Sequence, residues 1–243
     1  MKHLRKGEQM MEKGLAPKVE ALYQAIMALF VEGADLNTLT VAEIARKAGI
    51  GKGTVYEYFD NKEEMIAEAA YYFAKVACQR MYKKLEEKES LYERMRLFLQ
   101  SMDEEMNDIV CFVRVLHVMM DNTTISNRLR KMVKNKSAEE VLITDLVRKI
   151  IEAEVEIDEE KENSAAYLEM MAFSRIICYA LYQFEMKERT NIAPGDMHEM
   201  ICRDICRDVE DFKAREAGSR RDVKPERESG NPAPDELPKA GKL

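Results

Sequence analysis

The chain has 243 residues, enough for one large hydrophobic core or two modest ones, because single domains usually hold about 100–150 residues. Its 46% hydrophobic and 34% charged residues, with only 10 glycines and 6 prolines, favour helices and few tight turns. No apolar run approaches the roughly 18–20 residues that a membrane helix needs, and the first residues are charged throughout. We therefore expect neither membrane insertion nor secretion.

The net charge of −7 excludes a protein that coats nucleic acid indiscriminately. The charge is, however, distributed unevenly. Residues 1–60 carry eight basic and eight acidic side chains, so the whole negative charge falls on the remaining 183 residues. The N-terminal part can therefore approach DNA, whereas the rest would be repelled.

The five cysteines are odd in number. Three of them, Cys78, Cys111 and Cys178, lie in apolar helical stretches, where a reduced thiol behaves as a small hydrophobe. This usage favours a cytoplasmic protein.

The first third of the chain predicts four short helices. Apolar residues recur at three- and four-residue spacing behind a proline, which predicts a helix over about residues 17–33. Two short helical segments follow within residues 41–59, separated by a Gly-Ile-Gly turn. Asn61 is expected to cap a further helix that begins at Lys62.

The rest of the chain also has helical periodicity, and no stretch alternates strictly enough to predict a strand. Breaks between helices are expected near residues 89–90, 107–108 and 121–124, and an acidic loop at 156–163. Two last helices are predicted at about 164–189 and 195–214. The chain beyond 214 holds four of the six prolines and almost no apolar anchor, so we expect it to be disordered. The predicted fold class is all-α.

Within residues 40–49 the pattern predicts a capped helix that ends in a sharp turn. The Thr40 side chain can cap the helix while Glu43 reaches back to it. The residues expected to face inward are Val41, Ile44, Ala45 and Ala48. Gly49 then reverses the chain, and the small alanines allow close approach of a second helix.

The second helix, from Lys52 to about Phe59, is predicted to bury Val55 and Phe59. The side chains left off that apolar stripe are Lys52, Thr54, Tyr56 and Tyr58. Gly53 lets the backbone come near a phosphate. A short exposed helix with amine, hydroxyl and aromatic groups suits a major groove, so the two segments predict a helix-turn-helix.

The run LTVAEIARKAGIGKGTVYEYFDNKEEMI, from Leu39 to Ile66, resembles the N-terminal DNA-binding domain of tetracycline-repressor (TetR) family regulators. The matching elements are the turn from Ala45 to Ala48-Gly49, then Lys52-Gly53-Thr54, Tyr56-x-Tyr58-Phe59 and Lys62. The resemblance implies an all-α, non-enzymatic regulator that binds a palindromic operator in double-stranded DNA as a homodimer. It also implies release from the operator by a small-molecule effector, which makes the protein a repressor, and helix four from Lys62 as the lever.

The resemblance also implies a division of the chain and a set of DNA-contacting residues. The division is a flexible arm at 1–16, a helix-turn-helix domain at 17–61, a ligand-binding and dimerisation domain at 62–214, and a disordered tail at 215–243. The DNA contacts are Thr40, Lys52, Gly53, Thr54, Tyr56, Tyr58 and Lys62. Tyr56, Tyr58 and Lys62 would clamp phosphates, and Thr54 with Lys52 would read bases.

Two residues depart from the family pattern. Gly51 stands where a serine or threonine is common. Glu57 places a negative charge on the recognition helix, where it either accepts a hydrogen bond from cytosine N4 or weakens affinity.

The middle of the chain is expected to hold an effector pocket lined by apolar, methionine and basic side chains. The expected lining residues are Phe98, Met102, Phe112, Arg114, Leu116, His117, Met120 and Phe173. Arg114 and His117 would orient an anionic or polar group of the effector. Each of these side chains can equally serve as core filling.

The two last helices are expected to form a four-helix dimer interface with a second copy. Its predicted residues are Tyr167, Met170, Ile177, Leu181, Met197, Ile201, Ile205 and Val209. The last four repeat at a spacing of four, as a helix packed on a partner requires. Packing within one chain is the alternative.

The sequence allows three further interpretations. An all-α enzyme is disfavoured, because no catalytic motif is present and the three histidines are scattered. His198, Cys202 and Cys206 lie at spacings of four, but they reach too far along a helix for one ion, so no metal site and no cofactor are predicted. A helical interaction protein that shares the fold without reading DNA remains the alternative function.

Overall fold

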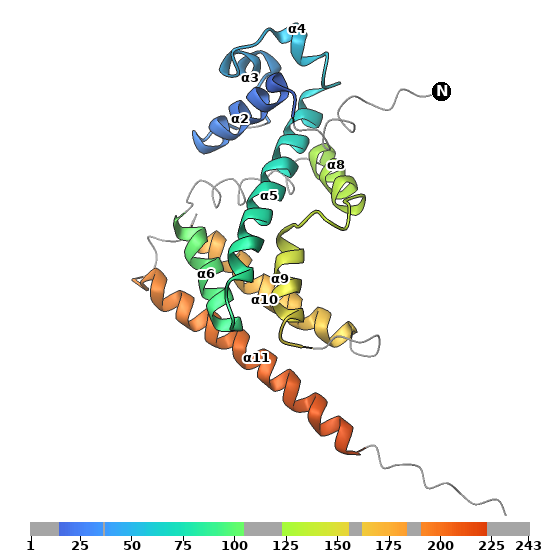
Figure 1. The fold of residues 1–243 in the computed structure, drawn as a ribbon. Helices are drawn as coiled ribbons and strands as arrows, with labels where there is room; N and C mark the ends of the chain where they lie inside the picture. Colours follow the sequence, from blue (N-terminus) through green and yellow to red (C-terminus); the bar gives the residue numbers. More distant parts are fainter. Residues whose placement is uncertain (1–14, 36, 105–122, 156–161, 184–190, 223–243) are drawn as a thin grey trace, which may run out of the picture.

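A computed structural model describes residues 15–35, 37–104, 123–155, 162–183 and 191–222, and all regular structure within them is α-helical apart from turns and one short π-type turn (Figure 1). The all-α prediction is confirmed. The helices are α2 (Pro17–Val31), α3 (Val41–Lys47), α4 (Lys52–Val55), α5 (Lys62–Glu86), α6 (Leu91–Glu104), α8 (Thr123–Lys134), α9 (Ile143–Glu152), α10 (Glu162–Leu181) and α11 (Pro194–Asp222). Within this part of the chain, none of them is long and apolar enough to cross a membrane.

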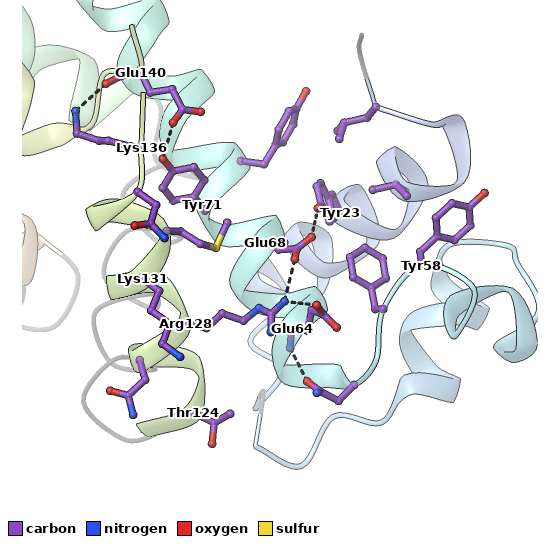
Figure 2. Close-up of a pocket in the computed structure, with 18 residues that line it drawn as sticks. Tyr23, Tyr58, Glu64, Glu68, Tyr71, Thr124, Arg128, Lys131, Lys136 and Glu140 are labelled. Atoms are coloured by element: carbon purple, nitrogen blue, oxygen red, sulfur yellow. Dashed lines mark hydrogen bonds and ion pairs between the residues drawn. The ribbon is translucent and has the colours of Figure 1, made fainter. Parts of the chain in front are cut away.

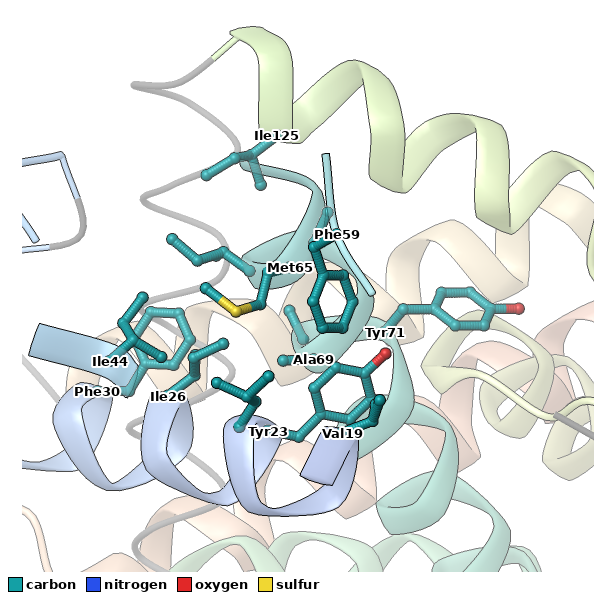
Figure 3. Packing of buried hydrophobic residues seen from close by; sticks show 14 of the residues in the cluster. Val19, Tyr23, Ile26, Phe30, Ile44, Phe59, Met65, Ala69, Tyr71 and Ile125 are labelled. Atoms are coloured by element: carbon teal, nitrogen blue, oxygen red, sulfur yellow. The ribbon is translucent and has the colours of Figure 1, made fainter. Parts of the chain in front are cut away.

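Helices α2, α3 and α4 form a small head that packs on the first turns of α5. Leu22, Ile26 and Phe30 repeat at spacings of four along α2 and are at most 1% exposed. They meet Ile44 of α3 and Met65 of α5 in one apolar cluster, the first core (Figure 3). Burial of this stripe explains why α2 is a stable helix, since most helical stability in proteins comes from packing.

The first core does not stop at the head. Ile125 and Leu129 of α8 are 1% and 5% exposed and pack into the same cluster. In Figure 3, Ile125 reaches the cluster from the side opposite α2. The predicted domain boundary between residues 61 and 62 therefore divides one apolar core, to which residues on both sides of the boundary contribute.

Helix α5 joins the head to the remaining helices without a linker (Figure 1). Its 25 residues span about 37 Å at the usual rise of an α-helix. The predicted cap is present, because the Glu64 backbone N–H donates to Asn61 Oδ1 at 2.8 Å. One continuous helix therefore belongs both to the first core and to the part of the chain next to the second core.

Helices α6, α9, α10 and α11 surround a second apolar cluster, the second core. Its most buried members include Met95 and Leu99 of α6, Ile151 of α9 and Ile176 of α10, all at 0% exposure. Helix α11 continues to Asp222, eight residues beyond its predicted end, which corrects the expectation of disorder from residue 215. The expected break at 107–108 lies outside the described residues, whereas the one at 89–90 falls between α5 and α6.

Candidate functional site

Helix α3 begins with the predicted reciprocal cap. The Glu43 backbone N–H donates to Thr40 Oγ1 at 3.2 Å, and the Thr40 backbone N–H donates to Glu43 Oε2 at 2.8 Å. The Thr40 hydroxyl also donates to Glu43 Oε2 at 2.7 Å, and this hydrogen bond lowers the pKa of Glu43. Thr40 is exposed, but its hydroxyl already serves the cap, so its contact with DNA stays a prediction.

The turn after α3 depends on one glycine. Gly49 has a φ of +69°, in the left-handed region that other residues enter only with strain. The Ile50 N–H then donates to the Ala45 carbonyl at 3.0 Å, which closes the turn. Ala45, at 2% exposure, lets the next segment pack close to α3.

The segment from Lys52 is α-helical only to Val55, shorter than predicted, because glycine, threonine and valine are weak helix formers. One further turn is still closed, since the Phe59 N–H donates to the Val55 carbonyl at 3.0 Å. Val55 and Phe59 are 2% and 3% exposed and anchor the segment in the first core, as predicted.

The other side of this segment carries most of the residues predicted to contact DNA. Lys52, Gly53 and Tyr56 are exposed, and Thr54 is half-buried. Tyr56 is 51% exposed, a large value for a tyrosine. Tyr58 is half-buried and packs against the first core, so only its outer part remains available to a partner.

Neither Gly51, the N-cap residue of α4, nor Gly53 within α4 is required by the fold. A Cβ atom added at Gly51 or at Gly53 would find no heavy atom within 4 Å. Neither position has a positive φ. Packing within the chain therefore does not explain these glycines. Because they have no side chain, the backbone of another molecule can approach α4 closely at these positions.

Lys62 holds the start of α5 against the loop that precedes α3. Its Nζ donates to the Asn37 carbonyl at 2.9 Å. The contact of Lys62 with a phosphate stays a prediction. Sequence reasoning assigned Lys62 only to DNA and did not foresee this structural role.

The head matches a known family of regulators by sequence. Residues 22–69, which run from α2 into α5, match the sequence profile of bacterial regulatory proteins of the tetR family. Residues 22–69 therefore form a domain of the TetR family. The exposed face of α4 lies within this domain, and its contact with DNA stays a prediction.

Solved structures of regulators resemble this chain over most of its length. FadR from Bacillus subtilis, in complex with stearoyl-CoA, is 17% identical with a TM-score of 0.57 over 76% of this chain and 96% of that one. FadR from Bacillus halodurans is 16% identical with a TM-score of 0.59 over 79% and 96%. A TetR regulator from Haloarcula marismortui is 15% identical with a TM-score of 0.53 over 79% and 96%. These likenesses establish the fold, and no curated protein sequence matches the chain significantly.

Three of the predicted effector-pocket residues lie within the described part of the chain. Phe98 is 4% exposed within the second core, and Met102 and Phe173 pack against that core from α6 and α10. The others, Phe112, Arg114, Leu116, His117 and Met120, lie outside the described residues. The three that are described pack in or against one core, and their contact with an effector stays a prediction.

A cleft that sequence reasoning did not foresee lies between the head and α8 (Figure 2). We call it the junction cleft. It has a volume of about 720 Å³ and is lined from α2, from the turn after α4, and from α5 and α8. Arg128 of α8 is one of the lining residues and forms ion pairs with two carboxylates of α5, those of Glu64 and Glu68. The Tyr23 hydroxyl of α2 donates to Glu68 Oε2 at 3.3 Å, so the network joins head and α8.

A second polar cluster is buried where α6, α10 and α11 meet. His198 is 5% exposed and contacts Asp103 and Tyr179, rather than the two cysteines that follow it in α11. Burial raises the pKa of Cys202 to about 12, which disfavours the thiolate that a metal would need. No group of three or more metal-ligating side chains occurs within the described ranges.

The predicted dimer residues separate into two sets. Tyr167 and Met170 of α10 are 58% and 53% exposed, and Ile177, Leu181, Met197 and Ile201 are half-buried. Ile205 and Val209 are 1% and 2% exposed within a single chain, because this face of α11 packs into the second core next to α6. Their prediction as interface residues is therefore wrong, and packing within the chain is the correct alternative for them.

Proposed function

We propose that this TetR-family regulator is a dimeric repressor that reads a palindromic operator with α4 and is released by a small-molecule effector. A DNA-binding role follows from the family of its head. The observation that carries the proposal is the exposed face of α4, where Lys52, Thr54 and Tyr56 stand clear of the first core. Such a regulator acts in the cytoplasm, has no enzymatic activity and needs no cofactor.

The surface of α10 supports the proposed dimer. Tyr167, Met170, Ser174 and Cys178 are all exposed and form an uncharged stripe along that helix. Exposed apolar side chains in a row are typical of a surface that another molecule covers. A two-fold interface would place the same stripe of two copies face to face.

Sedimentation of a charged variant tests the dimer. Met170→Glu places a carboxylate in the stripe, and we expect it to shift the protein toward the monomer. Val133→Glu is the matched control, because Val133 is 43% exposed on α8, away from α10. A Met170→Glu protein that sediments like the Val133→Glu protein would contradict this interface.

An effector pocket in the helical domain is proposed from the fold it shares with FadR, whose solved structure holds stearoyl-CoA. Phe98, Met102 and Phe173, which lie in or against the second core, would line this pocket with apolar side chains. An apolar effector would bind between α6 and α10 and change the relative position of two heads. Two heads must be about 34–36 Å apart to fit successive major grooves, so a small rotation suffices to weaken binding.

Selection of DNA from a random or genomic pool at near-physiological salt tests the proposed function. We expect an enriched palindrome whose half-sites are about one helical turn apart. The enriched site should bind with a steep salt dependence, as phosphate contacts require. Absence of any enrichment would instead favour the helical interaction protein that shares the fold without reading DNA.

A further inference from the structure

The junction cleft has walls that belong to different parts of the fold. One wall comes from the head, with Tyr23 of α2 and Tyr58 and Phe59 after α4. The opposite wall is α8, which packs on α5 from the other side (Figure 2). A molecule bound here would contact both the DNA-binding head and α8.

The wall on the head side is aromatic. The Tyr23 ring centroid lies 5.6 Å from that of Tyr72 and 6.1 Å from that of Phe59. Tyr58 and Tyr72 are half-buried and line the cleft, so part of each ring faces the open volume. Such a wall suits a planar aromatic or conjugated group.

The wall on the α8 side offers hydrogen-bond donors. Helix α8 has the sequence TTISNRLRKMVK, with four basic residues and no acidic one. Asn127, Lys131 and Asn135 are spaced by four residues, are exposed, and all line the cleft; we call them the donor row. A cation flanked by two amides on one helix face is complementary to an acid group.

The other cations that line the cleft are already neutralised. Arg128 pairs with Glu64 and Glu68, and Lys136 Nζ lies 3.1 Å from Asp145 Oδ1. Among the described residues, no carboxylate forms an ion pair with Lys131. Three carboxylates also line the cleft, and each forms an ion pair, Glu64 and Glu68 with Arg128 and Glu140 with Lys75. Lys131 is therefore the lining cation that can attract an anion to the donor row.

We propose that the junction cleft binds a small organic anion, with its planar part against the tyrosines and its acid group on the donor row. This site is separate from the apolar pocket proposed between α6 and α10. Since its walls belong to the head and to α8, occupancy changes the position of the head. The effect on DNA rests on the proposed function, whereas binding of the anion does not.

Fluorescence titration with anilinonaphthalene sulfonate tests the site, because this probe combines fused aromatic rings with one sulfonate. Lys131→Glu reverses the charge of the donor row. Lys134→Glu is the matched control, since Lys134 is an exposed lysine one turn further along α8 that does not line the cleft. We expect about tenfold weaker probe binding by Lys131→Glu, from loss of a charge-assisted hydrogen bond, and unchanged binding by Lys134→Glu.

Equal affinity of the two variants for the probe would overturn the proposal, whether both equal the unchanged protein or both are weaker. Circular dichroism of each variant shows that α8 is still folded. A second titration measures the affinity of the unchanged protein for its selected DNA, with and without the probe. Probe binding without any change in DNA affinity would overturn the coupling between cleft and head, while DNA selection without the probe reports separately on the proposed function.

Discussion

The Nε2 nitrogen of His198 lies 2.7 Å from the hydroxyl oxygen of Tyr179, and both side chains are buried. Tyr179 donates its only hydroxyl hydrogen to Asp103 Oδ1 at 2.6 Å and accepts from Gln183 Nε2 at 2.7 Å. His198 Nε2 must therefore carry a hydrogen, directed toward Tyr179 and toward Asp103 Oδ2 at 3.0 Å. The cluster satisfies its buried polar groups with a neutral imidazole and joins α6, α10 and α11.

This arrangement predicts a dependence of stability on pH. Burial, the largest cause, lowers the pKa of His198, although Asp103 opposes the shift. The unfolded chain, whose histidines have a pKa of about 6.5, then binds more protons than the folded chain at acidic pH. The stabilisation is complete above that pKa and is lost as the pH falls below it.

The variant His198→Gln isolates this contribution, because glutamine keeps an N–H that can donate to Asp103 but does not titrate. We expect a smaller decrease in the free energy of unfolding between pH 7 and pH 5 than in the unchanged protein. Urea unfolding at several pH values measures it. Identical pH dependence in both proteins would show that His198 does not titrate differently on unfolding.

Removal of Arg128 should destabilise the protein. The Glu64 side chain is 5% exposed, so Arg128→Ala leaves a buried carboxylate without its ion pair. We expect a loss of about 2–3 kcal/mol in the free energy of unfolding, below the usual cost for fully buried pairs because Arg128 is 30% exposed. Arg130→Ala, at an exposed position of the same helix, should cost less than about 0.5 kcal/mol. Equal losses in thermal or urea unfolding would contradict the role of Arg128.

The two glycines of the helix-turn-helix should respond differently to alanine. Gly49→Ala forces a φ of +69° on a residue with a Cβ and should cost about 1–2 kcal/mol of stability. Gly53→Ala meets open space and should leave stability unchanged or raise it by up to about 1 kcal/mol. Gly53→Ala should nevertheless weaken DNA binding about fivefold, the value of one lost close contact. If the Gly53→Ala variant binds DNA with unchanged affinity, the proposed close contact between Gly53 and a phosphate is contradicted.

Tyr56 and Thr54 should affect DNA binding in different ways. Tyr56→Phe would remove the proposed phosphate contact and should weaken binding about fivefold for every DNA sequence alike. Thr54→Val would remove the proposed base contact and should relax the preference at one base pair, by about 1–3 kcal/mol. Tyr82→Phe is the control, since Tyr82 is half-buried near the far end of α5 and packs against the second core. Binding measured on a panel of single-base operator variants separates the three outcomes, and a sequence-dependent loss in Tyr56→Phe would reassign that residue to base reading.

Features set by neighbours in the chain could be predicted from the sequence. The Thr40–Glu43 cap and the Asn61 cap join groups three residues apart, so their chemistry is visible in a short window. The inward positions Ile44 and Val55 follow from helical spacing in the same way. The family resemblance then placed these helices in a DNA-binding head.

Features set by distant contacts could not be predicted. Periodicity shows that one face of α11 is buried, but it does not show whether α6 or a second chain covers Ile205 and Val209. Arg128 and Glu64 are 64 residues apart, and no local pattern pairs them. The one available signal was that α8 has four basic residues and no acidic one, which indicates that its charges are balanced by another element.

The participation of α8 in the first core has a consequence for protein engineering. Ile125 and Leu129 close the apolar cluster on which α2 and the start of α5 depend. A chimera that joins residues 1–61 to the helical domain of another regulator would replace these two side chains with those of a foreign helix. Successful exchange of operator specificity between regulators of this kind thus requires transfer of the contacting face of α8 together with the head.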